Sequence, residues 1–158
     1  MKKFSFPGKS NKTKQKNKKT ILFVCIENSA RSQMAEAFFR KYAPQHYETL
    51  SAGTRPSGEI NPLVVQVMKE IGIDISKQKP KEITENMIRI PEKIVNMGCM
   101  DKSACPTLFL NSNAIIDWNI EDPKGRPIEK VREVRDIIEQ RVKELVSNLS
   151  TPSKQINF

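Results

Sequence analysis

The sequence predicts an α/β fold, a single domain with a four-stranded parallel sheet flanked by helices. Three observations support this class. Strand-like and helix-like segments alternate along the chain, as they do in βαβ units. The first strand-like run, Ile21–Ile26, is continuously apolar, as expected for a central parallel strand that is buried on both faces. The length of 158 residues suits one domain with an adequate core.

Each element has a local reason. Gly53 ends the second strand, Asn61 and Pro62 are the residue types of a helix cap and a first helical position, and Gly72 stops that helix. Apolar residues recur at three- and four-residue steps in the last helix. In full, we expect strands at 21–26, 47–52, 93–97 and 114–118, and helices at 33–42, 63–71, 85–90 and 131–149.

The positive charge of the chain is concentrated at its start. Residues 1–19 contain eight lysines and no acidic residue, and the formal net charge of the whole chain is +9, so the remaining residues carry only about +1. Because like charges repel, we predict a disordered Lys-rich tail at 1–19, a folded domain at 20–149 and a frayed C-terminus at 150–158. A solvated solubility tail is favoured over a weak contact with nucleic acid.

The sequence also bears on location. No apolar run is long enough to span a membrane, and no secretory signal precedes the first strand. We therefore expect a cytoplasmic protein without a membrane partner, in which thiols stay reduced. No spare apolar surface is evident, so we expect a monomer.

The segment "CIENSARS" carries the chemistry of the chain. Cys25 ends the first strand, and Arg31 and Ser32 open the next helix. Ligands bind at the carboxyl ends of parallel strands, and a loop that leads into a helix N-terminus is a natural anion site. Such a site favours the thiolate form of Cys25, and the planar fork of Arg31 suits two oxygens of a tetrahedral oxyanion. Ser32 can donate to the sulfur, and Asn28 can bond its own backbone.

The competing interpretation is a buried, inert cysteine and a surface arginine. A cysteine and an arginine at this spacing occur often by chance. Their positions at a strand end and a helix start, with Asn and Ser between them, favour a site with a nucleophile and an oxyanion cradle.

The stretch "VCIENSARSQMAEAFF" resembles the signature loop of the low-molecular-weight tyrosine phosphatase fold, and "RSQMAEAF" is similar to its thioredoxin-coupled arsenate reductase branch. The resemblance extends over about residues 20–149, through "SAG", "NP", "IDIS" and "DWNIEDPKGRPIEKVREVRDII". It implies an oxyanion bound by the backbone and side chains of one loop: Ile26, Glu27, Asn28, Ser29, Ala30, Arg31 and Ser32.

Two further cysteines follow the third strand in "VNMGCMDKSACPTLF". Cys99 and Cys105 have the chemistry of a resolving pair, since a second thiol can attack an adduct on Cys25 and pass the disulfide to a third. A zinc site with His46 is disfavoured because no two ligands have finger-like spacing, so we expect no metal. The remaining alternative is that both are small buried side chains.

The acid of the reaction is expected in "EDP". In the resembled family the aspartate directly before proline protonates the leaving group, and this position corresponds to Asp122. Oxygen leaves arsenic or phosphorus poorly unless it is protonated. On its own, an Asp-Pro pair is more typical of a turn.

Together these features predict an arsenate reductase that needs no cofactor, in which Cys25, Arg31, Cys99, Cys105 and Asp122 are catalytic. Its expected partners are arsenate, phosphate as a competitor, and a thioredoxin-like reductant. A low-molecular-weight phosphotyrosine or phosphoester phosphatase is the alternative, although such phosphatases usually carry tyrosines after Asp-Pro, where this chain has "KGRP". A further alternative is a non-enzymatic oxyanion-binding or redox-sensing module.

Departures from the family pattern lead to two expectations. Glu27 is an acid in an anion loop, so its side chain is expected to point away from the anion. Some relatives bind potassium near the loop, and Asn28, Glu36 and Ser51 match that site. Lys81 falls where an acidic ligand is expected, so we expect no ion there and the Lys81 ammonium in its place.

Overall fold

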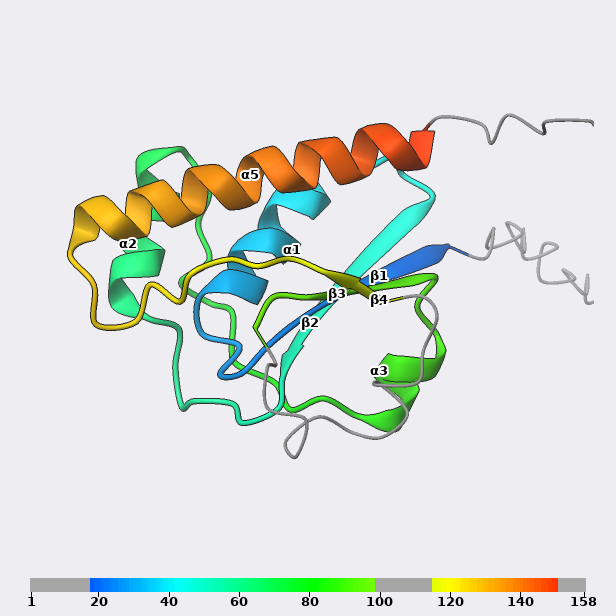
Figure 1. The fold of residues 1–158 in the computed structure, drawn as a ribbon, viewed down its shortest axis with the longest axis horizontal. Coiled ribbons are helices and arrows are strands. Elements are labelled where there is room, and N and C mark those ends of the chain that lie inside the picture. Colours follow the sequence, from blue (N-terminus) through cyan, green and yellow to red (C-terminus); the bar gives the residue numbers. More distant parts are fainter. Residues whose placement is uncertain (1–17, 99–114, 151–158) are drawn as a thin grey trace, which may run out of the picture.

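The chain folds around a four-stranded parallel sheet in the order β2-β1-β3-β4, which confirms the predicted class (Figure 1). The structure is a computed structural model, and it describes residues 18–98 and 115–150. The strands are β1 (Lys19–Cys25), β2 (Tyr47–Gly53), β3 (Lys93–Asn96) and β4 (Ile115–Asp117). Cys99 and Cys105 lie outside the described residues, as do residues 1–17 and 151–158, so the predictions for the two ends of the chain stay predictions.

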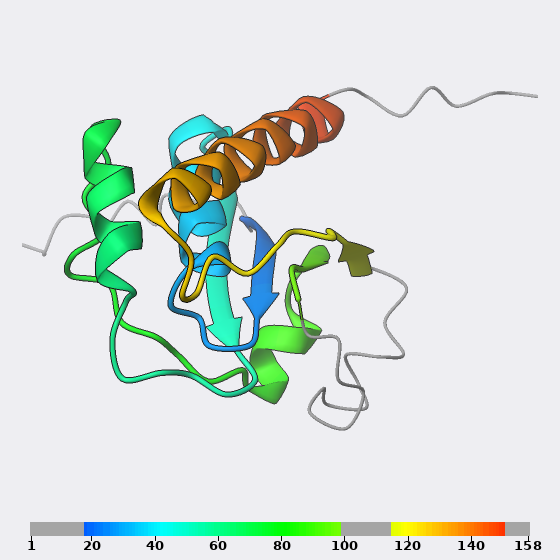
Figure 2. The ribbon, with the colours of Figure 1, turned by 60° about the vertical axis from the view of Figure 1, so that its left-hand side comes forward.

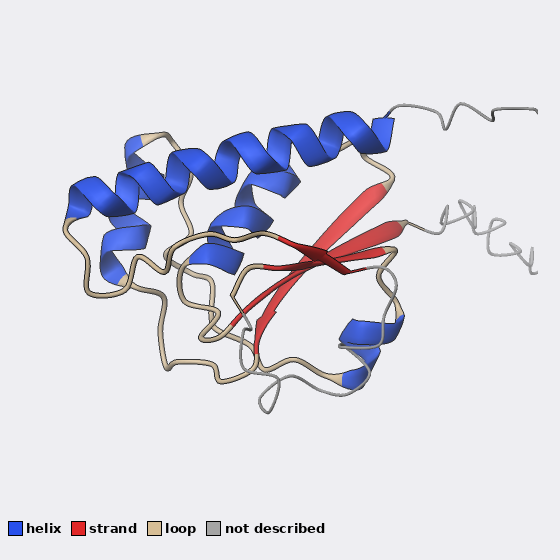
Figure 3. Cartoon of the chain, in the orientation of Figure 1, coloured by secondary structure: helices blue, strands red, loops and turns tan. Residues whose placement is uncertain are grey.

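The helices form one layer on each face of the sheet. They are α1 (Arg31–Tyr42), α2 (Pro62–Glu70), α3 (Glu85–Arg89) and α5 (Ile128–Ser150). Helices α1, α2 and α5 cover one face and the short α3 covers the other (Figures 2 and 3). Among the described helices, none combines the length and the apolar character needed to cross a bilayer.

The central strand β1 divides two cores of unequal size. Its side chains alternate, with Ile21 and Phe23 facing α1 and α5, and Leu22 and Val24 facing α3. Phe23 is fully buried, and its ring centre lies 5.8 Å from that of Phe39. Truncation of such a buried ring to alanine costs about 3–5 kcal/mol. Helices cover both faces of β1, as predicted, and this explains why the strand is continuously apolar.

Two element boundaries differ from the prediction in a way that matters for the site. Ile26, expected in the first strand, lies beyond the end of β1 and is 36% exposed. Helix α1 begins at Arg31, two residues before the expected start. Arg31 and Ser32 are polar and buried, so a search for apolar periodicity passes over them. Asn61 caps α2 as predicted, and its Oδ1 accepts the Leu63 N–H at 3.0 Å.

Candidate active site

The candidate site is the loop between β1 and α1, at the carboxyl edge of the sheet. We call residues 25–31 the oxyanion loop. Cys25 is the last residue of β1 and only 3% exposed, and Arg31 is the first residue of α1 and 6% exposed. The side chains of residues 28–33 are all buried. The strand and the helix thus fix both ends of the loop.

Four carbonyl groups of the oxyanion loop point to the outer side of the loop, toward the chain that follows β2, and accept hydrogen bonds there. They accept N–H bonds from the chain that follows β2, at 2.8–3.2 Å: Thr54 to Cys25, Arg55 to Ile26, Ser57 to Glu27, and Asn61 to Ser29. A peptide whose carbonyl points outward directs its N–H the other way. These four bonds therefore turn the neighbouring N–H groups of the loop toward its inner side.

The inner N–H groups are available to an anion. Within residues 18–98 and 115–150, no acceptor is bonded to the N–H groups of Ile26, Glu27, Ser29 and Ala30. Ala30, the residue before α1, makes no side-chain cap that would occupy the helix N-terminus. Unpaired N–H groups and the positive end of a helix dipole together attract a tetrahedral oxyanion.

The sulfur of Cys25 lies among hydrogen-bond donors. The Asn28 N–H donates to Cys25 Sγ at 3.2 Å, and Ser32 Oγ lies 2.9 Å from the same sulfur. Asn28 Nδ2 donates to Ser32 Oγ at 2.7 Å, so the oxygen of that hydroxyl accepts from the amide. Its hydrogen is then free to point at the sulfur. Donors directed at sulfur stabilise the thiolate, which is the nucleophilic form.

Asn28 is the residue that organises the loop. Its φ of 50° lies in the left-handed region, which Asn tolerates better than most residues. Its Oδ1 accepts from Gln33 Nε2 at 3.0 Å and from the Lys81 N–H at 2.9 Å, which fixes the amide so that Nδ2 faces Ser32. Gly53 makes room for this turn, since a Cβ there would lie 2.9 Å from the Asn28 nitrogen.

Arg31 is aimed by backbone carbonyls. Its Nη1 donates to the carbonyls of Met97 at 2.6 Å and Ile120 at 3.0 Å. Its Nη2 lies 3.5 Å from Asp122 Oδ2. A Cβ on Gly98 would collide with the guanidinium, so only glycine leaves room for this arginine. Carbonyls after β3 and β4 therefore direct the fork of Arg31 toward the loop.

Asp122 belongs to the segment that joins β4 to α5, residues 118–127, which we call the acid loop. Figures 1 and 2 show this yellow segment beside the blue oxyanion loop, in agreement with the Arg31–Asp122 contact. The Asp122 side chain is 46% exposed, and its Oδ1 accepts the Lys124 N–H at 3.0 Å. The geometry brings the predicted acid to the predicted arginine.

Three residues that contribute to this site were not predicted to do so from the sequence. Gln33, Gly98 and Lys124 lie within segments already singled out, yet no residue pattern gave them a role. Lys124 Nζ lies 2.5 Å from Glu27 Oε1, so the carboxylate of Glu27 is directed at the acid loop. No described contact links that carboxylate to Cys25 or Arg31.

The side chains that match the potassium ligands of some relatives are bonded to protein donors here. Both acceptor positions of Asn28 Oδ1 are used, and the Glu36 carboxylate accepts from Ser51 Oγ and from Arg40 Nη2 at 2.9 Å. The expectation for Lys81 was wrong in one respect. Its ammonium is exposed and donates to the Lys79 carbonyl at 3.4 Å, and it is the backbone N–H that reaches Asn28.

His46 is far from the thiol. It directly precedes β2, whose first residue Tyr47 pairs with Lys19 at the start of β1, whereas Cys25 is at the other end of that strand. His46 and Cys25 therefore cannot share one metal ion. In the described part of the chain, no group of three or more His, Cys, Asp or Glu side chains could hold a metal.

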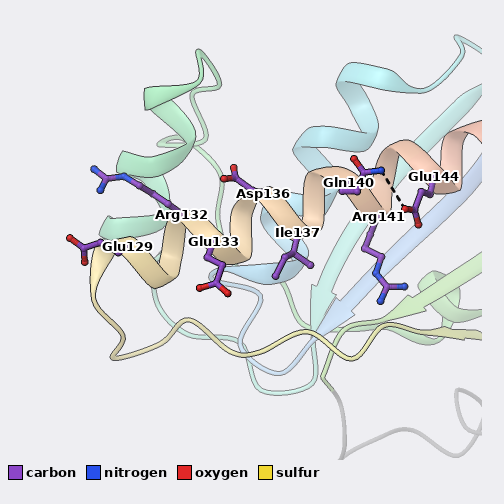
Figure 4. A pocket seen from close by; sticks show the side chains of 8 residues that line it. All are labelled: Glu129, Arg132, Glu133, Asp136, Ile137, Gln140, Arg141 and Glu144. Carbon is purple, nitrogen blue, oxygen red and sulfur yellow. Dashed lines mark hydrogen bonds between the residues drawn. The ribbon is translucent and has the colours of Figure 1, made fainter.

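A hollow on the outer side of α5 is separate from this chemistry. Figure 4 shows the eight side chains that line it, all from α5: Glu129, Arg132, Glu133, Asp136, Ile137, Gln140, Arg141 and Glu144. None of them belongs to the oxyanion loop or the acid loop. Charged groups of both signs line the hollow, so it has no single electrostatic preference.

Comparison with known proteins agrees with this geometry. The family model of the low molecular weight phosphotyrosine protein phosphatases matches residues 20–155. An arsenate reductase of Brevibacillus brevis is 41% identical over 127 residues, which cover 80% of this chain and 93% of that protein.

Two solved structures are also similar. One, an arsenate reductase in the phosphate-binding state, is 34% identical with a TM-score of 0.73, and the match covers 84% of this chain and 99% of that one. The other, a thioredoxin-dependent arsenate reductase of Corynebacterium glutamicum, is 34% identical with a TM-score of 0.69 and covers 85% of this chain and 64% of that one.

Proposed function

The chain belongs to the low-molecular-weight phosphotyrosine protein phosphatase family, and we propose that within this family it is an arsenate reductase. One observation carries the proposal. The Cys25 sulfur lies among donors in a loop whose N–H groups at residues 26, 27, 29 and 30 have no acceptor within the described residues, and the buried Arg31 ends that loop. The arsenate reductases at 34–41% identity support arsenate as the anion, and one of them is described in a phosphate-binding state.

The first step is attack of the Cys25 thiolate on arsenic. The N–H groups of the loop and Arg31 hold the oxyanion and stabilise its charge. A sulfur–arsenic bond forms, an arsenic–oxygen bond breaks, and Asp122 gives the departing hydroxyl a proton so that it leaves as water. The position of Asp122, 3.5 Å from Arg31 Nη2, supports this role.

The second step transfers two electrons to arsenic. We propose that Cys99 attacks the Cys25 sulfur, so that the sulfur–arsenic electron pair stays on arsenic and arsenite leaves. Cys105 then attacks Cys99, which frees Cys25 and leaves a Cys99–Cys105 disulfide. Both cysteines lie outside the described residues, so this cascade rests on the residue types and on the family.

A single turnover tests the cascade. Fully reduced protein is mixed with excess arsenate and no external thiol, and arsenite and free thiols are counted. We expect one arsenite formed and two thiols lost per chain. Cys99→Ser is expected to bind phosphate normally and form no arsenite. Arsenite formation by Cys99→Ser at the rate of the parent protein would rule out the scheme.

We propose a thioredoxin-like dithiol as the electron donor, supported by the thioredoxin-dependent relative from Corynebacterium glutamicum. Multiple-turnover rates with a thioredoxin system and with a glutathione–glutaredoxin system separate the two donors. Dependence on the second system alone would reject the proposed donor. A reducing compartment is needed to keep the three thiols available, so we place the enzyme in the cytoplasm.

Phosphoester hydrolysis is not favoured as the main activity. It needs Cys25, Arg31 and Asp122 but neither of the other cysteines. Lys124 and Gly125 stand where phosphatases of this family usually carry tyrosines, and the relatives at 34–41% identity reported above are arsenate reductases. A low residual phosphatase activity is expected because the loop chemistry is shared.

A further inference from the structure

Glu27 is an acidic residue in a loop built to attract an anion. Its side chain is 31% exposed, and it occupies the second position after the thiol-bearing strand. An unpaired carboxylate at this point would repel arsenate or phosphate, since like charges at short range disfavour binding. The carboxylate is paired, because Lys124 Nζ lies 2.5 Å from Oε1, and Ser29 Oγ lies 3.5 Å from Oε2.

Lys124 connects this pair to the catalytic acid. It stands two residues after Asp122, and its own N–H donates to Asp122 Oδ1 at 3.0 Å. The acid loop therefore touches the oxyanion loop at three points: the Ile120 carbonyl and Asp122 meet Arg31, and Lys124 meets Glu27. The Lys124–Glu27 contact does not involve Arg31, so it restricts the rotation of the acid loop about that arginine.

The charge of Lys124 is secure at neutral pH. Its pKa is raised above the usual value, first by the hydrogen bond to Glu27, then by the charge of Glu27 and by the charge of Asp122. Because the pKa is raised, Lys124 is protonated at every pH below the ordinary lysine pKa, and its ion pair with Glu27 is intact in that range. The ion pair is lost only as the pH rises through the raised pKa. Lys124 is 65% exposed, and exposed pairs stabilise the fold little. Its effect is therefore expected on the site and not on folding.

We propose that Glu27 and Lys124 are a positioning pair, which holds Asp122 over the oxyanion loop and cancels the negative charge that Glu27 brings to the anion site. Neither side chain touches the reacting atoms. The inference depends on the proposed function only in naming arsenate as the anion. Its central prediction concerns inorganic phosphate, whose binding needs neither Cys99 nor Cys105.

Two neutralising variants separate charge from structure. Lys124→Met leaves the negative charge of Glu27 uncompensated near the anion site, so the affinity for phosphate is expected to fall roughly 10-fold. Glu27→Gln releases the Lys124 ammonium, so the affinity is expected to stay equal or rise about threefold. Both variants lose the Lys124–Glu27 contact between the two loops, so both should lower kcat by roughly 3- to 10-fold. A purely structural role would move the two affinities in the same direction.

The experiment uses the full reduced chain and titrates inorganic phosphate calorimetrically. Turnover is measured with arsenate and separately with p-nitrophenyl phosphate, which reports on Asp122 even if arsenate reduction fails. Lys124→Arg keeps the charge and should keep the affinity. Arg126→Met is the matched control, because it removes another exposed ion pair of the acid loop, the 2.6 Å contact with Glu121.

The outcomes are distinct. A fall of phosphate affinity in Lys124→Met without a fall in Glu27→Gln, with kcat lowered in both and Arg126→Met near the parent protein, supports the pair. Equal shifts in the same direction, or shifts below twofold in both, overturn it. A chain that binds phosphate as predicted but forms no arsenite would contradict the proposed function and leave the positioning pair supported.

Discussion

The oxyanion loop and the acid loop face the same anion, but the chain holds them by different means. Asn28 of the oxyanion loop and the adjacent Ser32 of α1 are fully buried and bonded to each other and to the sulfur. In the acid loop, Asp122 and Lys124 are largely exposed and held by ion pairs. Removing a buried hydrogen bond costs about 1–3 kcal/mol, whereas an exposed ion pair contributes about 0–1 kcal/mol.

This difference indicates that the two loops have separate roles. The hydrogen bonds that hold the oxyanion loop form when the protein folds. Its N–H groups are therefore oriented before the anion binds. The exposed loop contributes its acid with little effect on folding. Changes in the first loop should therefore alter stability and function together, whereas changes in the second should alter rate or anion affinity and leave stability unchanged. The predictions below test that separation.

The largest effect is expected for Arg31→Lys. The ammonium cannot reproduce the planar fork, and it loses at least one of the two carbonyl partners at Met97 and Ile120. We expect kcat/KM for arsenate to fall roughly 1,000-fold and the free energy of unfolding to fall by about 1–3 kcal/mol. Steady-state kinetics and urea unfolding measure the two effects on one preparation.

The matched control lies on the same helix. Arg40 is 56% exposed and pairs with Glu36, so Arg40→Lys should change both quantities little. A large loss of activity by Arg31→Lys without any loss of stability would show that the oxyanion loop is not coupled to the fold as argued.

The next effect concerns the acid loop. Asp122→Asn removes the proton donor but keeps the shape of the side chain, so kcat should fall roughly 100-fold. The melting temperature should stay within about 1 °C, because this side chain is 46% exposed. Phosphate affinity should not fall, since a negative charge beside Arg31 is removed.

Glu121→Gln is the control for this change, because Glu121 is the preceding acid and its described ion pairs are with Arg126 and Lys130, outside the oxyanion loop. Its kcat should match that of the parent protein. Equal losses in the two variants would assign the effect to the charge of the acid loop and not to proton donation by Asp122.

A smaller effect is expected for Gly98→Ala, which links the two loops. The added methyl group meets the Arg31 guanidinium, which must shift away from the carbonyls that aim it. We expect kcat/KM to fall roughly 10-fold. Gly72→Ala is the matched substitution, because Gly72 also has a positive φ, 82°, and nothing lies within 4 Å of a Cβ at that position. Similar kinetics for the two variants would show that the aim of Arg31 tolerates displacement.

The same difference explains what the sequence could predict. Cys25 and Arg31 were singled out because each stands at a recognisable boundary, the end of an apolar strand and the start of a helix. Asp122 was assigned from the family resemblance, since an Asp-Pro pair alone is more typical of a turn. The parallel pairing and the central, buried first strand follow from alternation and apolar content, whereas the complete strand order came from the structure.

The contacts that arrange these residues were not predictable. The carbonyls of Met97 and Ile120 carry no residue-specific signal, and they meet Arg31 across 66 and 89 positions of the chain. Glu27 and Lys124 are 97 positions apart. A charged residue in a polar loop is ordinarily solvated, so only the fold reveals which opposite charge it faces.

The last prediction is an absence of effect, and it tests whether the oxyanion loop holds itself together. Among the described residues, the Asn28 Oδ1 and the Glu36 carboxylate already accept hydrogen bonds, from Gln33, Lys81, Ser51 and Arg40. A potassium ion would have to compete with these donors for the same oxygens. We expect the melting temperature in potassium chloride and in sodium chloride of equal concentration to agree within about 1 °C, and phosphate affinity to agree within twofold. A saturable, potassium-specific rise of several degrees, abolished by Glu36→Gln, would mean that a cation and not the amide of Asn28 supports the loop. The oxyanion loop would then depend on a bound cation, much as the acid loop depends on its ion pairs. The two loops would differ less in how they are held than argued above.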